Sequence, residues 1–235
     1  MNSTNLSRAL LNKLGASIVR GEYEVGKSLP AESDLAISHN VSRTAVREAI
    51  KMLSAKGLVR SWPRRGAIVQ KESDWNLLDP EVMEWILGRG ISVPLVKDFL
   101  NMRLAIEPAA VFMATKNRAD ISEIRGAVNA MRRADKDGEH TLSADCEFHA
   151  AILRASGNRF FAQMSPLVDT ALRMTIRVSN QIKGVSMASI EEHEEILRAI
   201  ESGHAENAHD LIKGHITEAL KLVQSAYPEN ENAGA

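Results

Sequence analysis

The sequence of 235 residues contains one cysteine, Cys146, which excludes an internal disulfide. A lone thiol is typical of proteins in a reducing compartment, where disulfides do not persist. No apolar run approaches the length that a membrane-spanning helix needs. The amino-terminal segment MNSTNLSRALLNKLGASIV also lacks the basic-then-apolar order and the cleavage site of a signal peptide. These absences predict a cytoplasmic protein without a membrane partner.

Aromatic residues are scarce, at 4% of the chain, whereas 44% of the residues are hydrophobic. With so few rings, the core has to come from aliphatic packing between helices. After residue 71 no strand pattern or internal repeat appears, and Gly, Asn and Asp separate a series of amphipathic segments. We expect a helical bundle of six to seven members, with helices over Pro80–Leu87, Pro94–Lys116, Ile121–Lys136, Leu142–Ala155, Phe160–Ser179, Ile190–Glu201 and Ala205–Ala226.

The segment from Leu29 to Val69 has a different pattern. It reads LPAESDLAISHNVSRTAVREAIKMLSAKGLVRSWPRRGAIV and contains two short amphipathic helices. Ser42 is a natural N-cap for the second helix, and Gly57 suits its end. A short hairpin over Leu58–Arg60 and Ala67–Val69 follows. This order of elements is typical of a winged helix-turn-helix.

The predicted fold class is therefore mainly α, with an N-terminal winged helix-turn-helix domain and a C-terminal all-α bundle. The predicted domains are a DNA-binding domain at 1–71, a linker at 72–80, an all-helical effector-binding and dimerisation domain at 81–227, and a disordered tail at 228–235.

Charge is distributed unevenly along the chain, although the formal net charge is only −1. Residues 1–71 carry 12 Lys and Arg against 5 Asp and Glu, whereas the remainder carries 17 against 25. A concentrated positive field suits phosphate binding, because neutralising phosphates releases counterions. The alternative is that the two helices and the hairpin are only a scaffold. The local excess of positive charge favours duplex DNA as the ligand of the first domain.

The donors that would contact DNA lie in two groups. The first turn and outer face of the second helix carry donors for phosphates and base edges, and the tip of the hairpin is basic. The predicted contacts are Ser42, Arg43, Thr44, Arg47, Arg64 and Arg65.

Three sequence runs in this region resemble the GntR family of bacterial transcription regulators. They are LP-x-E-x-x-LA, VSR-x-x-VREA-[IL]-x-x-L and the G-L-V run with its basic, Gly-containing wing. The resemblance implies that the start of the second helix reads the operator and that the wing enters the minor groove. It also implies that Gly66 lets the wing backbone approach DNA closely. One departure is Ser33, which stands where relatives often have a basic residue that reaches DNA.

A second group of polar residues lies on apolar faces of the predicted bundle. Asp145 and His149 are four residues apart, so they project from one side of a helix. His193 and His215 fall among aliphatic positions of two other helices. An isolated buried carboxylate is costly unless it is paired or bound to a cation. An aspartate with neutral imidazoles suits zinc or another borderline divalent ion, and a hydrogen-bonded polar core is the alternative.

The bundle also resembles the metal-binding FCD subclass of the FadR-type GntR regulators. The resemblance lies in the D-x-x-F-H run at Asp145–His149, the E-H-x-x-I-x-x-A-I run at His193, the late helical His215 and the MRLAIEPAA helix. It implies that these four residues bind a metal at the base of an effector cavity. Zinc is the expected cofactor, with nickel or manganese as alternatives.

The resemblance further implies a role for Arg103, which stands at the family position that pairs with the acid group of an effector. A bidentate guanidinium–carboxylate pair supplies both charge and orientation. Arg177 is the second predicted effector contact. It lies four residues after Arg173 on another predicted helix, so the two can line the same cavity, although a solvated or salt-bridged position is favoured for Arg173. The string WNLLDPEVMEWIL resembles regulators of sugar-acid catabolism. The expected effector is therefore a small carboxylate, with a sugar acid as the leading class.

Together these patterns predict a homodimeric transcription regulator, most simply a repressor, that is released from a pseudo-palindromic operator by a small organic acid. Two alternatives belong to other classes of protein. One is a metal-dependent hydrolase fused to a DNA-docking module, because a His/Asp metal site can activate water. The other is an architectural DNA-binding protein with a purely dimerising bundle. No further residue stands out as a general base, and we therefore do not expect an enzyme.

Overall fold

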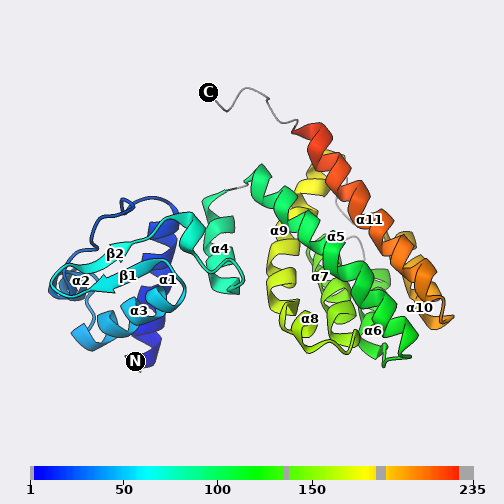
Figure 1. Cartoon of the computed structure of the whole chain (residues 1–235), viewed down its shortest axis with the longest axis horizontal. Coiled ribbons are helices and arrows are strands. Elements are labelled where there is room, and N and C mark those ends of the chain that lie inside the picture. The colour runs from blue at the N-terminus through cyan, green and yellow to red at the C-terminus, as the bar shows by residue number, and fades with distance from the viewer. Residues whose placement is uncertain (1–2, 91, 135–137, 184–188, 228–235) are drawn as a thin grey trace. The chain divides into compact units, whose positions relative to one another are not determined.

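The computed structural model describes residues 3–90, 92–134, 138–183 and 189–227 (Figure 1). The chain divides into two compact units, Met1–Gly90 and Ile91–Ala235. The first contains a two-stranded sheet, and the described part of the second is helical. This architecture confirms the predicted fold class. None of the helices within the described ranges is long and apolar enough to cross a membrane. The predicted tail at 228–235 lies outside the described residues.

The first unit consists of short helices around one hairpin. Its elements are α1 (Ser3–Val19), α2 (Glu32–Ser38), α3 (Arg43–Ala55), β1 (Val59–Trp62), β2 (Gly66–Val69), the 3-10 helix η1 (Glu72–Asp74) and α4 (Pro80–Arg89). Helix α1 packs on α3, and α2 packs on α3 as the first helix of the helix-turn-helix. The core of the unit is aliphatic, with Leu11, Leu35 and Leu53 almost fully buried.

Local chemistry sets the limits of α3. The Ser42 hydroxyl accepts a hydrogen bond from the Ala45 N–H at 3.2 Å, which caps the first turn as the sequence predicts. Gly57 follows the helix with φ of 80°, a conformation that costs a residue with a side chain. A Cβ at Gly57 would lie 2.3 Å from the Asp74 carbonyl oxygen, so the chain passes too closely there for any side chain.

The hairpin is antiparallel, with Val59 opposite Val69 and Trp62 opposite Gly66. It is longer than predicted, because β1 extends to Trp62 and β2 begins at Gly66. The tip turns through residues 63–65, and the Arg65 N–H donates to the Trp62 carbonyl at 3.2 Å. The Ser28 hydroxyl donates to the Arg65 carbonyl at 2.8 Å, which ties the tip to the preceding loop.

Helix α4 belongs to the first unit. The Asp79 carboxylate caps it, and the Lys56 ammonium at the end of α3 pairs with Asp79 at 2.5 Å and with Glu81 at 2.7 Å. Helix α4 also packs on α1 through its buried face. The boundary between the units therefore falls at residue 90 rather than in the linker predicted at 72–80. The pattern of polar and apolar residues after the wing does not show that α4 packs on α1, which lies earlier in the chain.

The second unit is a bundle in which α7 lies among the other helices (Figure 1). Its described elements are α5 (Val93–Lys116), α6 (Ser122–Arg133), α7 (Gly138–Ala155), α8 (Arg159–Gln163), α9 (Ser165–Lys183), α10 (Ile190–Glu201) and α11 (Ala205–Ala226). Helices α5 and α11 run side by side, and α7 packs against α5, α6 and α9. The bounds of α10 and α11 agree with the prediction.

One predicted helix of the bundle is divided in two. The sequence analysis expected a single helix over Phe160–Ser179, whereas the structure has α8, then Met164, then α9. Pro166 explains the break, because it has no N–H to donate to a carbonyl in the preceding turn and disfavours helical geometry at the residue before it. In the first turn of α9 the missing N–H costs nothing.

The close approach of α1 and α4 can be tested at Gly15. A Cβ at this position would lie 2.5 Å from Cζ3 of Trp85, a rigid and almost fully buried ring. Gly15→Ala should therefore lower the free energy of unfolding by about 1–3 kcal/mol, the range typical of overpacking. Thermal denaturation followed by circular dichroism measures the change. Gly214→Ala is the matched control, because a Cβ there meets nothing within 4 Å. Equal stability of the two variants would contradict the packing of α4 on α1.

Candidate functional site

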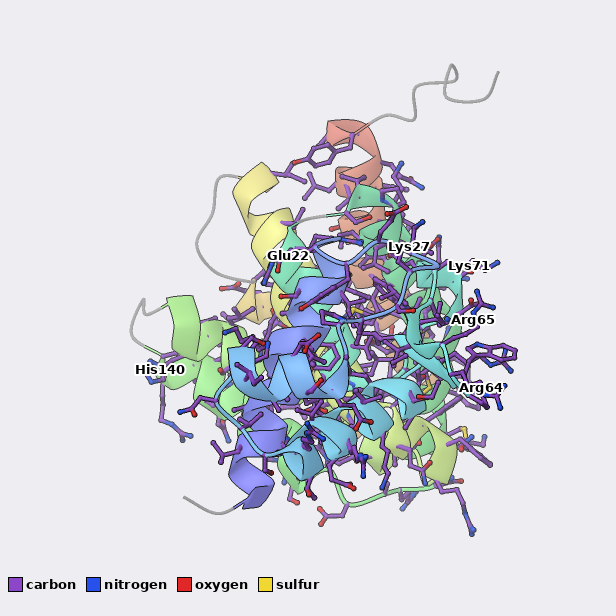
Figure 2. All side chains as sticks on the ribbon, turned by 90° about the vertical axis from the view of Figure 1, so that its left-hand side faces the viewer. Glu22, Lys27, Arg64, Arg65, Lys71 and His140 are labelled. Carbon is purple, nitrogen blue, oxygen red and sulfur yellow. The ribbon has the colours of Figure 1, made fainter. Side chains whose placement is uncertain are left out.

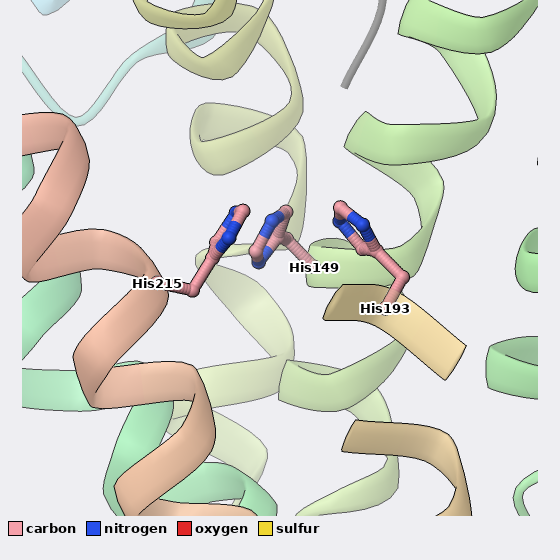
Figure 3. A group of neighbouring side chains, drawn as sticks. All are labelled: His149, His193 and His215. Atoms are coloured by element: carbon pink, nitrogen blue, oxygen red, sulfur yellow. The ribbon is translucent and has the colours of Figure 1, made fainter. Parts of the chain in front are cut away.

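Three histidines from three helices meet inside the second unit (Figure 3). His149 comes from α7, His193 from α10 and His215 from α11. Each offers a ring nitrogen, and the three atoms lie within 4.8 Å of one another. His149 and His193 are at most 1% exposed, and the side chain of His215 is 20% exposed. The structure therefore brings together the three histidines that the sequence places on apolar helical faces.

The second nitrogen of each imidazole is held by an acceptor. Nδ1 lies 2.7 Å from Glu107 in His149, 2.8 Å from the Ser189 carbonyl in His193 and 2.5 Å from Glu192 in His215. A carbonyl or an ionised carboxylate can only accept, so each Nδ1 carries the proton. The Nε2 lone pairs are then left for the centre of the cluster. Metal-binding histidines in proteins are commonly oriented in this way.

Asp145 completes the group of predicted metal ligands. Its side chain is 2% exposed, and Oδ1 lies 3.2 Å from Nε2 of His193 and 3.4 Å from Nε2 of His149. Two lone pairs directed at a carboxylate repel it unless a proton or a cation lies between them. Oxygen and imidazole nitrogen are the ligands that zinc and similar ions prefer. The donor set and the orientation of the rings therefore fit a divalent ion.

The ionisable groups of the cluster shift the pKa values of one another. Burial alone would raise the pKa of Asp145, but the neighbouring His193 and His149 hold it well below its usual value. Burial would lower the pKa of His193, yet the Asp145 carboxylate outweighs it and raises that pKa. Burial dominates at His215 and lowers its pKa. The Asp145 carboxylate therefore favours a positive charge beside it, which a protonated imidazole or a divalent ion would supply.

Arg103 lies beside this cluster, in α5. It is 3% exposed, its Nε donates to Glu107 at 2.6 Å, and its Nη2 donates to the other oxygen of Glu107 at 3.3 Å. Nη2 also lies 3.0 and 3.1 Å from the two ring nitrogens of His149. These nearly equal distances place it against the face of the ring. The residue predicted to contact an effector thus adjoins the predicted metal ligands.

Glu107 is a member of the site that the sequence analysis missed. It is fully buried, and although burial raises the pKa of a carboxyl, Arg103 and His149 together lower the pKa of Glu107 to about 2. The available signal was the i, i+4 spacing of Arg103 and Glu107 on the apolar face of one helix. Glu192, which orients His215, was also missed, because it directly precedes His193 and reads as a surface acid.

The two other arginines considered for an effector cavity lie on α9. The Arg173 guanidinium contacts Asp169 at 3.3 Å and the Ser143 hydroxyl at 3.1 Å, which agrees with a salt-bridged position. The side chain of Arg177, predicted to bind the effector, lies outside the described residues.

The predicted DNA contacts of the helix-turn-helix lie at the start of α3. Arg43, Thr44 and Arg47 are exposed, whereas the hydroxyl of Ser42 is engaged in the helix cap. Arg47 Nε donates to Glu32 at 2.7 Å, and this ion pair raises the pKa of Arg47. Exposed pairs of this kind contribute little to stability. The guanidinium can therefore exchange Glu32 for a phosphate at low cost.

The wing supplies a second group of basic side chains. Figure 2 shows Lys27, Arg64, Arg65 and Lys71 along one edge of the first unit, with Glu22 away from that edge. The wing turn requires positive φ at Arg64 and Gly66, 63° and 75° respectively. A Cβ at Gly66 would meet nothing within 4 Å, so its backbone is open to a ligand. Trp62, 48% exposed under the Arg60 guanidinium, adds an aromatic ring that the sequence analysis did not single out.

Comparison with known proteins identifies two families along the chain. Residues 6–69 match the bacterial regulatory proteins of the gntR family, and residues 98–218 match the FCD domain. The first match covers the helix-turn-helix and the wing. The second covers Arg103, Glu107 and the whole histidine cluster.

Individual relatives agree with these matches. The chain is 36% identical to the uncharacterised HTH-type transcriptional regulator YieP of Escherichia coli, over 69% of this chain and 73% of the relative. It is 30% identical to the galactonate operon transcriptional repressor of Escherichia coli, over 83% of this chain and 87% of the repressor. Among solved structures, Lar, which controls expression of the Listeria monocytogenes agr system, aligns with a TM-score of 0.66 at 19% identity, covering 93% of this chain and 96% of that one. The last likeness shows a shared fold.

The histidine cluster predicts that a divalent ion stabilises the second unit. Zinc at 100 times its Kd should add about 2.7 kcal/mol to the free energy of unfolding, because only the folded chain presents the site. Calorimetric melting with zinc, nickel, manganese or a chelator measures this. The shift should diminish as the pH falls through the histidine range, since Asp145 raises the pKa of His193 and a proton then competes with the ion.

Two variants show whether the cluster is responsible. His193→Ala should lose most of the metal-induced shift, whereas His204→Ala should keep it, because His204 precedes α11 and lies outside the cluster. An equal shift in both variants would mean that the ion binds elsewhere.

Proposed function

Because the chain belongs to the GntR family of bacterial regulatory proteins and carries an FCD domain, we propose that it represses a catabolic operon and is released from the operator by a small organic acid. The family consists of DNA-binding transcription regulators, so the chain is a regulator and the metallohydrolase alternative is set aside. The repressor role, the effector and the metal are parts of the proposal.

The DNA-binding half of the proposal rests on the exposed donors of the first unit. Arg43, Thr44 and Arg47 open α3, the second helix of the helix-turn-helix, which enters the major groove in proteins of this architecture. The basic edge with Arg64 and Arg65 would follow the phosphates beside it. A homodimer would present two copies of α3 to the two halves of a pseudo-palindromic operator.

The observation that carries the effector half is a buried arginine beside a convergent set of metal ligands. Nη1 of Arg103 has no hydrogen bond to any described residue, although the side chain is 97% buried. No fully buried side-chain nitrogen or oxygen among the described residues lacks a partner, so Nη1 is not completely enclosed by the protein. The Nη1 and Nη2 end of the guanidinium would therefore receive a carboxylate.

The chemistry of the neighbouring site narrows the class of effector. Asp145, His149, His193 and His215 would hold a divalent ion, which supplies Lewis-acid sites for oxygen ligands. An anion with a carboxylate and an adjacent hydroxyl or keto oxygen can use both the ion and Arg103. Sugar acids have this arrangement, and one relative is a repressor of a galactonate operon. We therefore propose a sugar acid or a related hydroxy acid as the effector and zinc as the first candidate for the ion.

The DNA-binding proposal predicts that Arg43 carries operator affinity. Arg43→Ala should weaken binding by about 1–3 kcal/mol if the side chain reads a base.

Arg47→Ala should weaken binding to all DNA sequences and make it less dependent on salt, as expected for a phosphate contact. Gel-shift titration with the promoter region of the chain's own gene measures both. Arg20→Ala is the matched control, because Arg20 follows α1 and pairs with Glu22 away from the wing. Wild-type affinity in both α3 variants would refute the assignment.

The effector proposal predicts that Arg103 controls release without contacting DNA. Arg103→Lys keeps a cation beside Glu107 but loses the planar fork that binds a carboxylate through two hydrogen bonds. The variant should bind operator normally and need at least tenfold more galactonate, or another active acid from a sugar-acid panel, for half-release. Arg173→Lys on α9 is the control and should respond like the wild type. Unchanged release in Arg103→Lys would place the anion anchor elsewhere, and Arg177 would then be tested next.

A further inference from the structure

We infer that Glu107 is a positioning residue that links the metal centre to the anion anchor, because its one carboxylate orients a metal-binding histidine and also neutralises the arginine beside it. This inference rests on the proposed function and adds to it a specific internal connection. The residue does not contact the ion or the effector in this assignment. It acts through His149 on one side and through Arg103 on the other.

The geometry leaves Glu107 with two partners of different kinds. Oε1 accepts from Nε of Arg103 at 2.6 Å, and Oε2 accepts from Nη2 of Arg103 at 3.3 Å and from Nδ1 of His149 at 2.7 Å. The carboxylate is 0% exposed, so no water competes for these contacts from the surface. The Oε2 atom therefore contacts both partners, and Oε1 binds Arg103 alone.

For His149, the consequence is a fixed tautomer. The hydrogen bond to Glu107 keeps the proton on Nδ1 and turns Nε2 toward Asp145 and the other two histidines. A carboxylate acceptor also makes the imidazole a stronger ligand than a neutral acceptor does. His193 has a backbone carbonyl in the corresponding place, so Glu107 supplies His149 with a charged acceptor that His193 lacks.

For Arg103, the consequence is partial neutralisation in a defined orientation. Glu107 pairs with Nε and Nη2 of the guanidinium, and Nη1 has no hydrogen bond to a described residue. Burial of an arginine without a counter-ion would be strongly unfavourable, and the Glu107 carboxylate supplies that counter-ion. The same negative charge opposes an incoming carboxylate. Glu107 thus favours the metal and restrains the affinity for the anion.

These two roles predict opposite effects of one substitution. Glu107→Gln keeps the size of the side chain and an oxygen acceptor but removes the charge. Zinc affinity, measured by competition with a chromophoric chelator, should fall by roughly 10- to 100-fold, as is typical when a residue behind a metal ligand is changed. Acetate affinity of the protein saturated with Co²⁺, followed by the visible absorption of the ion, should rise by roughly 3- to 10-fold because a like charge has gone. A purely structural role of Glu107 would lower both affinities.

The control variant is Glu123→Gln, which removes an exposed carboxylate that pairs with Arg154 on the bundle surface. It should change neither affinity. If Glu107→Gln does not fold, as judged by circular dichroism, the zinc measurement is made on Arg103→Met and on Arg103→Met/Glu107→Gln. In this background no guanidinium is left unpaired, and the added Glu107→Gln change should again lower zinc affinity by at least tenfold.

The outcomes separate the inference from the function on which it rests. A wild-type protein that binds neither zinc nor acetate would refute the metal and effector parts of the proposed function. Wild-type binding with an unchanged zinc affinity in Glu107→Gln, or in the double variant relative to Arg103→Met, would refute the role at His149. A fall in zinc affinity without a rise in acetate affinity would refute the link to Arg103.

Discussion

The second unit depends on the mutual compensation of charges inside its core. Asp145, Glu107 and Arg103 are each at most 3% exposed, and they lie against two buried histidines. Removing a charged group from water costs several kcal/mol, and only close partners recover this cost. The residues come from α5, α7 and α10, so the same contacts that compensate the charges fix how these helices pack. Aliphatic residues would need no such compensation, so these buried charges support the proposal of a ligand site at this place.

The first unit carries its basic side chains at the surface rather than in the core. There Arg47 has an exposed acidic partner, and Arg64 and Arg65 form part of the wing turn. Surface charges contribute little to folding, so these side chains are available for the phosphate contacts that we propose, and counterion release would then contribute to the affinity. The stability of this unit comes instead from aliphatic packing between α1, α2 and α3 and from α4, which the Lys56 pairs secure.

Sequence patterns predicted the helices and the site to different extents. Helices with clear punctuation, such as Ile190–Glu201, were located correctly, because Ser202 and Gly203 end the apolar periodicity. The division at Met164 was missed because apolar residues continue across it. The histidines were found from helical spacing alone, whereas Glu107 was not, since periodicity identifies a buried face without saying which distant side chain will meet it. The partners of a buried charge depend on how α5 and α7 cross, which is a property of the whole fold.

The buried charges of the second unit and the surface charges of the first suggest how an acid bound to one unit could control DNA binding by the other. An acid that releases the operator must bind the DNA-free form more tightly than the DNA-bound form, and by linkage the operator lowers the affinity for the acid by the same factor. Such coupling needs an element with two discrete arrangements. We propose the group of Glu107, Arg103 and His149 as this element, because a carboxylate bound to Arg103 would change the charge that Glu107 balances. Because Glu107 lies on α5 and His149 on α7, binding of the acid would then change the forces that hold these two helices together.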